Sequence, residues 1–196
     1  AWLAETSALI RSLDGNHLIS IGSEGSWGCE GDMNLYEHIC ADKNVDYMNI
    51  HLWPYNWGWA RARHLREDLG RACQNTKDYI DQHLAVSQRL RKPLVMEEFG
   101  FPRDGFSFSK EAQTSVRDDY YDYVFGLISD ARKKGGLFAG CNFWGWGGEA
   151  TPEHDDWRVG DPYTGDPAQE AQGLNSVFNS DKSTLKIISK WNKKLR

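Results

Sequence analysis

The chain has 196 residues, a formal net charge of −5 at pH 7 and a pI of about 5.7. This acidic balance argues against nucleic acid or an anionic membrane surface as a partner, and no apolar run approaches the ~20 residues of a membrane span. Because domains commonly contain about 100–200 residues, we expect a single domain over residues 1–196.

The hydrophobic pattern predicts helices that alternate with short apolar strands. In chain order we expect a helix over 1–13, a strand over 17–21, a helix over 33–42, a strand over 45–51, an aromatic loop over 52–60, a helix over 76–91 with Thr76 as its N-cap, a strand over 93–98, a helix over 111–134, a strand over 137–144, a long loop over 145–172 and a closing helix over 183–194.

This order, a leading helix followed by four βα units, predicts an α/β fold with a buried parallel sheet. A complete (β/α)₈ TIM barrel has eight strands and takes ~250 residues, so the pattern indicates half of such a barrel. The alternative is an open doubly wound sheet, but no glycine-rich phosphate-binding loop follows the first strand.

The cysteines and the first residue say little about the compartment. Four cysteines occur and none forms a Cys-x-x-Cys pair, so zinc binding and redox chemistry have little support. Cys141 lies in an apolar strand, a position typical of a buried free thiol. Cys29, Cys40 and Cys73 could pair in an oxidising compartment, which the sequence leaves open. The chain begins at Ala1 without a Met, as processed or truncated chains do.

Chemically useful side chains follow three of the predicted strands. The run 92–98 ends in Glu98, His51 ends an earlier strand, and Trp144 ends a later one. One carboxylate, one imidazole and several indoles at the ends of parallel strands indicate a sugar-binding site. The competing interpretation of Glu98 is a helix cap or an ion pair with Arg103. We expect Arg103 and Asp104 to form a local ion pair.

The segments around these strand ends resemble the C-terminal half of a glycoside hydrolase family 5 enzyme of the endo-β-1,4-mannanase type. The matching segments are His17–Gly25, Val45–Tyr47, His51–Pro54, Glu97–Gly100, Asn142–Trp144 and Gly160–Pro167. The resemblance implies a (β/α)₈ barrel, retaining hydrolysis of β-mannan without a metal or organic cofactor, and a secreted or periplasmic location.

The resemblance also implies roles for individual residues. Glu98, directly before Phe-Gly, matches the nucleophile, while Glu97 is expected on the opposite face of the strand. His51 matches a histidine beside the nucleophile, and Trp144 a tryptophan that stacks under the sugar. Trp53 stands where many relatives have a tyrosine whose hydroxyl contacts the nucleophile, which puts that contact in doubt.

For three further tryptophans, Trp57, Trp59 and Trp146, we hold sugar binding and packing equally open.

Part of the family pattern is missing. The acid/base glutamate of the family follows an asparagine, yet the chain contains no Asn-Glu dipeptide, and the strand-two arginine has no counterpart. A half-barrel would also expose strand edges and an apolar concave face, so we expect a homodimer or a complementing N-terminal half. In a homodimer, Glu149 of the second copy is the candidate acid/base, with Glu24 as its rival.

Two other functions stay open at this point. A non-catalytic carbohydrate-binding half-barrel would keep the tryptophans without the acid. A truncated, inactive fragment would keep the fold alone.

Overall fold

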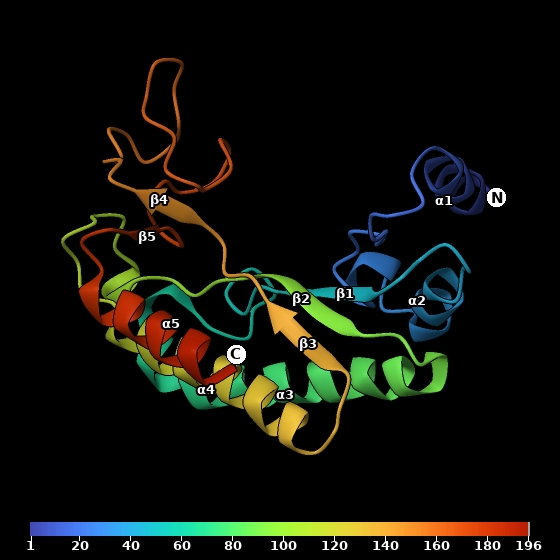
Figure 1. Cartoon of the computed structure of the whole chain (residues 1–196). Coiled ribbons are helices and arrows are strands. Elements are labelled where there is room, and N and C mark those ends of the chain that lie inside the picture. The colour runs from blue at the N-terminus through green and yellow to red at the C-terminus, as the bar shows by residue number, and fades with distance from the viewer. Residues whose placement is uncertain (196) are drawn as a thin grey trace.

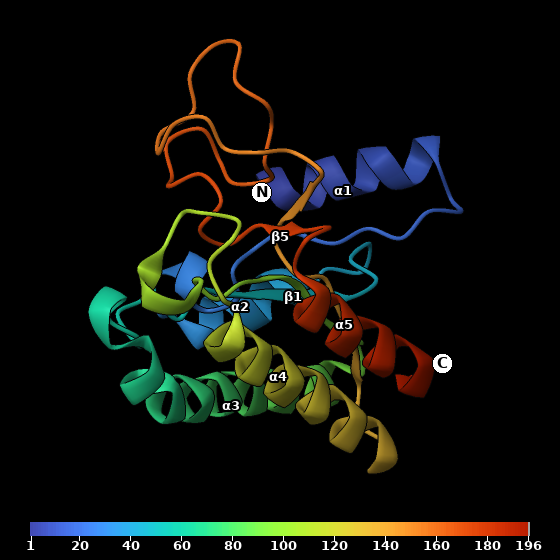
Figure 2. The same ribbon diagram turned by 90° about the vertical axis from the view of Figure 1, so that its left-hand side faces the viewer.

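The computed structural model describes residues 1–195, and a three-stranded parallel sheet lies at its centre. The strands are β1 (Met48–Leu52), β2 (Leu94–Phe99) and β3 (Phe138–Cys141), in the order β1-β2-β3. The long helices α3 (Leu65–Leu90) and α4 (Ser115–Lys133) lie on one face of this sheet, and α5 (Lys182–Leu195) packs beside α4 (Figures 1 and 2). The predicted parallel α/β arrangement is therefore confirmed for these strands.

The first predicted strand, 17–21, does not join the sheet. Its main link to the next segment is through Asp46: the Asp46 backbone N–H donates to the Ile19 carbonyl at 2.8 Å, and the Ile19 N–H donates to the Asp46 carboxylate at 2.7 Å. A side chain thus takes the place of a backbone carbonyl, and no ladder continues from it. Arg11 of helix α1 (Trp2–Leu13) pairs with the same carboxylate.

The N-termini of α2 and α3 differ in how they are capped. Helix α2 (Met33–Cys40) is capped by Asp32, whose carboxylate accepts from the Asn34 N–H at 2.8 Å. Thr76 is not an N-cap, because α3 begins at Leu65 and Thr76 is buried inside it. Its hydroxyl lies 2.8 Å from the hydroxyl of Tyr120 in α4, so it is a packing residue between two helices.

The chain after β3 contains structure that the sequence pattern did not predict. Strand β3 is shorter than the expected 137–144. Within the expected loop, β4 (Trp146–Gly148) pairs in parallel with β5 (Val177–Phe178), and the intervening segment projects away from the sheet (Figure 1).

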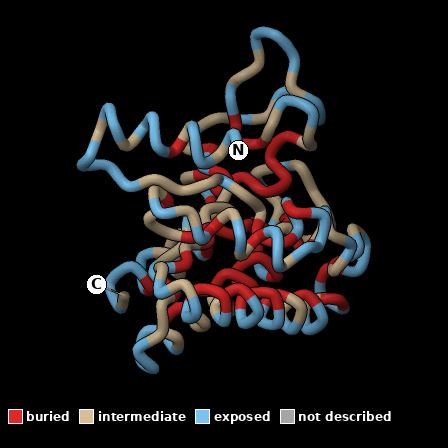
Figure 3. Tube along the Cα trace, turned by 90° about the vertical axis from the view of Figure 1, so that its right-hand side faces the viewer, coloured by how far each residue is buried: buried red, intermediate tan, exposed pale blue. Residues whose placement is uncertain are grey.

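The hydrophobic core fills the space between the sheet and the helices. Ile50, Met96 and Phe138 come from the strands, and they pack with aromatic residues of α4 such as Tyr121 and Phe125. Buried segments therefore concentrate in the sheet and on the inner sides of α3 and α4 (Figure 3). The opposite face of the sheet carries polar side chains and positions the candidate site.

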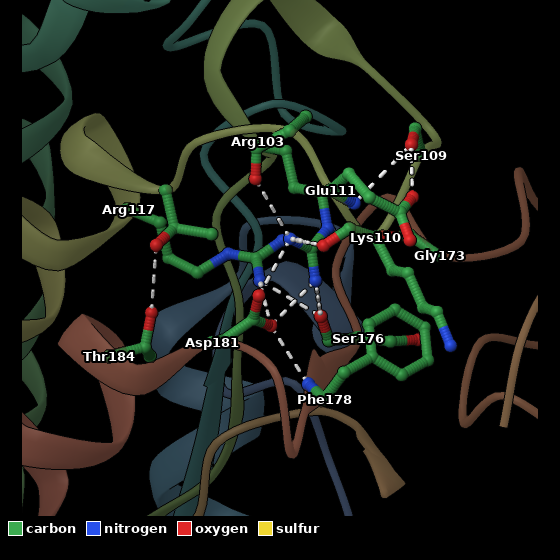
Figure 4. Close-up of polar contacts among 12 residues, drawn as sticks. Arg103, Ser109, Lys110, Glu111, Arg117, Gly173, Ser176, Phe178, Asp181 and Thr184 are labelled. Atoms are coloured by element: carbon green, nitrogen blue, oxygen red, sulfur yellow. Dashed lines mark hydrogen bonds and ion pairs between the residues drawn. The ribbon is translucent and has the colours of Figure 1, made fainter. Parts of the chain in front are cut away.

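Two fully buried arginines fix the segment that leads to α5. Arg103 donates to both oxygens of Asp181, at 2.8 and 2.6 Å (Figure 4). Arg117 donates to the backbone carbonyls of Phe101 and Ser176. The expected Arg103–Asp104 ion pair is wrong.

Asp104 instead accepts from the backbone N–H of Val116 at 2.8 Å, at the first turn of α4. A carboxylate near a helix N-terminus is stabilised by the helix dipole and the free N–H groups, which explains this placement.

All four cysteines are free thiols in the structure, and burial raises the pKa of Cys40 and Cys141 to about 12. Within residues 1–195, no helix combines the length and apolar character needed to cross a membrane.

Candidate active site

The carboxyl ends of the three central strands meet at one end of the sheet. The register pairs His51 of β1 with Glu98 of β2 and Leu52 with Phe99. Beyond β3, the Trp144 N–H donates to the Phe99 carbonyl at 2.8 Å. The three strand ends thus bring the His51 imidazole, the Glu98 carboxylate and the backbone of Trp144 to one end of the sheet.

His51 and Glu98 lie in direct contact, with 3.2 Å between the His51 Nδ1 and a Glu98 carboxylate oxygen. Burial raises the pKa of Glu98, a hydrogen bond from the Trp53 side chain lowers it, and the charge of Glu97 raises it. Burial lowers the pKa of His51, although Glu24 and Glu97 raise it. The net lowering favours the neutral imidazole, which lies directly against the Glu98 carboxylate.

Glu97 also belongs to this cluster, and the prediction that it faces the opposite side is wrong. A β-bulge lies between Ile50 and His51, so that Ile50 pairs with Met96 and His51 with Glu98. Glu97 is the extra residue, and a bulge redirects the side chains around it.

The carboxylate of Glu97 is held by two donors. One oxygen accepts from the hydroxyls of Ser20 and Tyr47, both at 2.9 Å, and the other lies 4.0 Å from the His51 Nε2. His51 therefore lies between two carboxylates. Sequence reasoning missed this role, because alternation along a strand gives no sign of a bulge.

A glycine allows the Trp53 indole and the Trp144 backbone to approach the end of β2. A Cβ atom at Gly100 would lie 2.6 Å from the Trp53 ring and 3.0 Å from the Trp144 carbonyl oxygen. Only glycine fits this position, because any side chain would collide with the Trp53 ring. The Trp53 indole therefore lies against the end of β2, and its side chain lowers the pKa of Glu98.

Of the other predicted tryptophans, Trp57 and Trp59 belong to an aromatic cluster and Trp146 lies in β4. Trp57 stacks on Trp27, with 4.8 Å between ring centroids, and meets Trp59 edge-on at 5.0 Å. Trp57 and Trp59 pack partly buried against the core. Trp146 in β4 is 53% exposed. Sugar binding by Trp57 and Trp146 stays a prediction.

Three further carboxylates could serve as an acid. Glu149 is exposed and accepts from the Asn179 side chain at 3.3 Å. Glu24 lies close enough to raise the pKa of His51. Burial raises the pKa of Glu170, as do the charges of Asp166 and Glu98. Glu170 was missed from the sequence, because an acidic residue in a loop rich in aspartate carries no distinguishing signal.

In the part of the chain that the structure describes, no group of three or more His, Cys, Asp or Glu side chains is arranged to hold a metal ion.

Comparison with solved structures defines the class of fold. An endo-β-1,4-mannanase from Thermotoga petrophila superposes with a TM-score of 0.59 at 22% identity, and covers 99% of this chain but 39% of its own. At that identity the likeness concerns the fold alone. It agrees with a partial TIM barrel.

The family follows from a closer match. The model for glycoside hydrolase family 5 β-mannosidase-like proteins matches residues 1–196, and the chain belongs to this family. A family 5 mannosidase from Rhizomucor miehei is 30% identical with a TM-score of 0.87, covering 99% of this chain and 47% of that chain. Mannan endo-1,4-beta-mannosidase 4 from Solanum lycopersicum is 28% identical over 168 residues, 79% of this chain and 39% of its own length. The chain thus spans less than half the length of these relatives.

Proposed function

We propose that this chain carries the nucleophile of a retaining glycoside hydrolase that acts on β-1,4-mannan, with Glu98 as that nucleophile. The observation that supports it best is the place of Glu98: at the end of a parallel strand, with a carboxylate oxygen 3.2 Å from the His51 Nδ1. Relatives named mannan endo-1,4-β-mannosidases, and a variant of the Rhizomucor mannosidase in complex with mannosyl-fructose, support a mannoside as substrate.

The proposed chemistry needs Glu98 in its ionised form. Its carboxylate attacks the anomeric carbon and forms a glycosyl ester while the glycosidic oxygen leaves with a proton, and water then hydrolyses the ester. Burial opposes ionisation of Glu98, whereas donors such as Trp53 favour it. Trp144 offers a ring against which the apolar face of the sugar can stack.

The leaving oxygen must take its proton from a second carboxyl about 5–5.5 Å from the nucleophile in a retaining enzyme. We propose that a second body supplies it, either a second copy of the chain or a complementing barrel half. The helices cover one face of the sheet only, and α1 exposes Trp2, Leu9 and Leu13 to solvent, which supports a missing neighbour. In the homodimer, Glu149 is the candidate acid, because it is exposed and free to face a partner.

A polysaccharide of this type is met outside the cell membrane, which supports a secreted or periplasmic protein. The second candidate function is carbohydrate binding without cleavage. It is favoured by one observation, the absence of an Asn-Glu dipeptide from the sequence.

Reducing-sugar release from β-mannan and from carboxymethylcellulose decides between cleavage and binding, with Glu98→Gln as the inactive reference. Light scattering of the same sample gives the oligomeric state. Wild-type chain that binds mannan but releases no sugar in any oligomeric state would favour the binding function. If Glu149→Gln leaves the activity of a dimer unchanged, Glu149 is not the acid.

A further inference from the structure

The exposed indole of Trp27 packs on a cluster of aromatic rings near the candidate site. Trp27 lies in a 3₁₀ turn (Trp27–Cys29) and is 49% exposed. One face of its ring stacks on Trp57, with centroids 4.8 Å apart and planes 19° from parallel. Trp57 is supported in turn by Trp59 at 5.0 Å and by Tyr79 of α3 at 5.3 Å. Trp27 is therefore backed on one side, while about half of its surface stays open to solvent.

The turn that carries Trp27 is fixed to α3. The Trp27 backbone N–H donates to the Tyr79 hydroxyl at 3.0 Å, and that hydroxyl donates to the Glu24 carbonyl at 2.6 Å. One residue earlier, the Ser26 N–H donates to His83 Nε2 at 2.9 Å. A ring held in this way loses little conformational freedom when a ligand stacks on it, which favours binding.

Glycine at position 25 makes this close attachment possible. Its φ is +87°, and a Cβ atom there would lie 2.6 Å from the Tyr79 hydroxyl and 2.9 Å from the Ile50 side chain. The turn thus rests directly on β1 and α3.

The position of Trp27 relative to Glu98 follows from the strand order. Trp57 lies in the loop after β1, and Trp144 follows β3, with Glu98 on the central strand between them. The Asn49 side-chain amide, two residues before His51 in β1, donates to the Ser23 carbonyl at 2.6 Å, so the segment that leads to Trp27 lies against β1. The segment that carries Trp144 and the Trp27–Trp57 stack therefore follow the strands on the two sides of β2, which carries Glu98.

We propose that Trp27 is a stacking platform for a pyranose unit of a β-linked mannan chain, on the β1 side of the cleavage point and remote from the bond that breaks. This inference rests on the proposed function. The apolar C–H face of a pyranose lies flat on an indole, and the ring N–H stays free for a hydroxyl. Trp57, for which the sequence left sugar binding and packing equally open, is then the support beneath the platform.

A flat ring of this kind fits a sugar better than a protein partner. The residues next to it, Gly28, Glu30 and Gly31, are exposed and offer no apolar surface to extend the contact. The exposed apolar side chains of α1, by contrast, lie on one helix and include no aromatic pair. Trp2 of that helix, 75% exposed, provides a matched control.

The test uses the full chain with Glu98→Gln, so that the polymer is not cleaved, in native gels with and without soluble galactomannan. In this background Trp27→Ala should weaken retardation by mannan about three- to tenfold, in line with the strength of one aromatic contact. Trp27→Phe should keep most of it, and Trp2→Ala should migrate like the Glu98→Gln parent. Equal retardation of Trp27→Ala and the parent, or an equal loss in Trp2→Ala, would overturn the platform.

A second measurement avoids dependence on a folded alanine variant. Titration of the wild-type indole N–H signals with mannohexaose should shift the Trp27 signal, assigned through Trp27→Phe, and leave the Trp2 signal in place. An unmoved Trp27 signal would refute the platform while leaving Glu98-dependent cleavage intact. If the wild-type chain cleaved no mannan but its Trp27 signal still shifted, the proposed hydrolase activity would be refuted. The role of Trp27 in binding sugar would still hold.

Discussion

The two faces of the central sheet differ in what they carry. The face toward α3 and α4 holds buried apolar residues such as Ile50, Met96 and Phe138. The other face holds His51 and Glu97, whose side chains meet polar partners. Alternation along three short strands thus gives stability to one face and chemistry to the other, and substitutions on the two faces should have separable effects.

The largest effect is expected from Glu98→Gln. If Glu98 is the nucleophile, activity on β-mannan should fall by about three orders of magnitude or more, because no covalent intermediate can form. The fold should persist, since the amide has nearly the same shape. Reducing-sugar assays and circular dichroism check the two halves of this prediction, and a variant that keeps one tenth of wild-type activity would contradict it.

On the helix-covered face, Ile50→Ala should lower the free energy of unfolding by about 2–5 kcal/mol, because it leaves a cavity in a fully buried site. Denaturant unfolding measures this loss. The exposed Leu13→Ala in α1 is the control and should change stability little in the isolated chain. Equal losses in both variants would show that burial does not distinguish the two positions.

A smaller effect concerns pH and stability. Burial raises the pKa of Glu98 above its ordinary value of 4.5, so the folded state favours the protonated form. The contribution of the protonated Glu98 carboxyl to stability is fully present below pH 4.5. It is lost as the pH rises through the pKa that Glu98 has in the folded state. Glu98→Gln should therefore be more stable than wild type at pH 7, and this advantage should shrink toward pH 4.5.

Thermal midpoints of both proteins between about pH 4 and pH 8 give the comparison. If the stability advantage of Glu98→Gln over wild type grew as the pH fell, folding would lower the pKa of Glu98 instead of raising it.

The smallest effect is expected from Glu97→Gln. Because the charge of Glu97 raises the pKa of His51, its removal should lower that pKa further below 6.5. Titration of the His51 ring by NMR measures the shift. Glu111→Gln, an exposed site far along the chain, should leave it unchanged. A raised or unaltered His51 pKa in Glu97→Gln would mean that the bulge does not couple the two side chains.

Local patterns predicted those parts of the fold that depend on local forces. The apolar runs around β1 and β2 predicted both strands within a few residues, because strands buried on a parallel sheet need such runs. The segment 17–21 has a similar run but forms no ladder, since the side chain of Asp46 takes its hydrogen bond. The apolar run alone does not reveal that the Asp46 carboxylate competes for the Ile19 N–H.

Contacts between distant residues set the limits of prediction. Arg103 was assigned to its neighbour Asp104, yet its partner is Asp181, brought near only by the packing of α5 on α4. In the candidate site, the strand ends pointed to Glu98 and His51, whose side chains lie in contact. Glu97 needed knowledge of the bulge, which depends on the register between two strands.

The open sheet has an evolutionary consequence. In residues 1–195, neither β1 nor β3 has a further strand on its outer side, while the helix-covered face is already complete. A unit built in this way carries its own interior and can be joined through its edges to different neighbours. Gene duplication or recombination can then join such a unit to a different neighbour without disturbing the contact between His51 and Glu98.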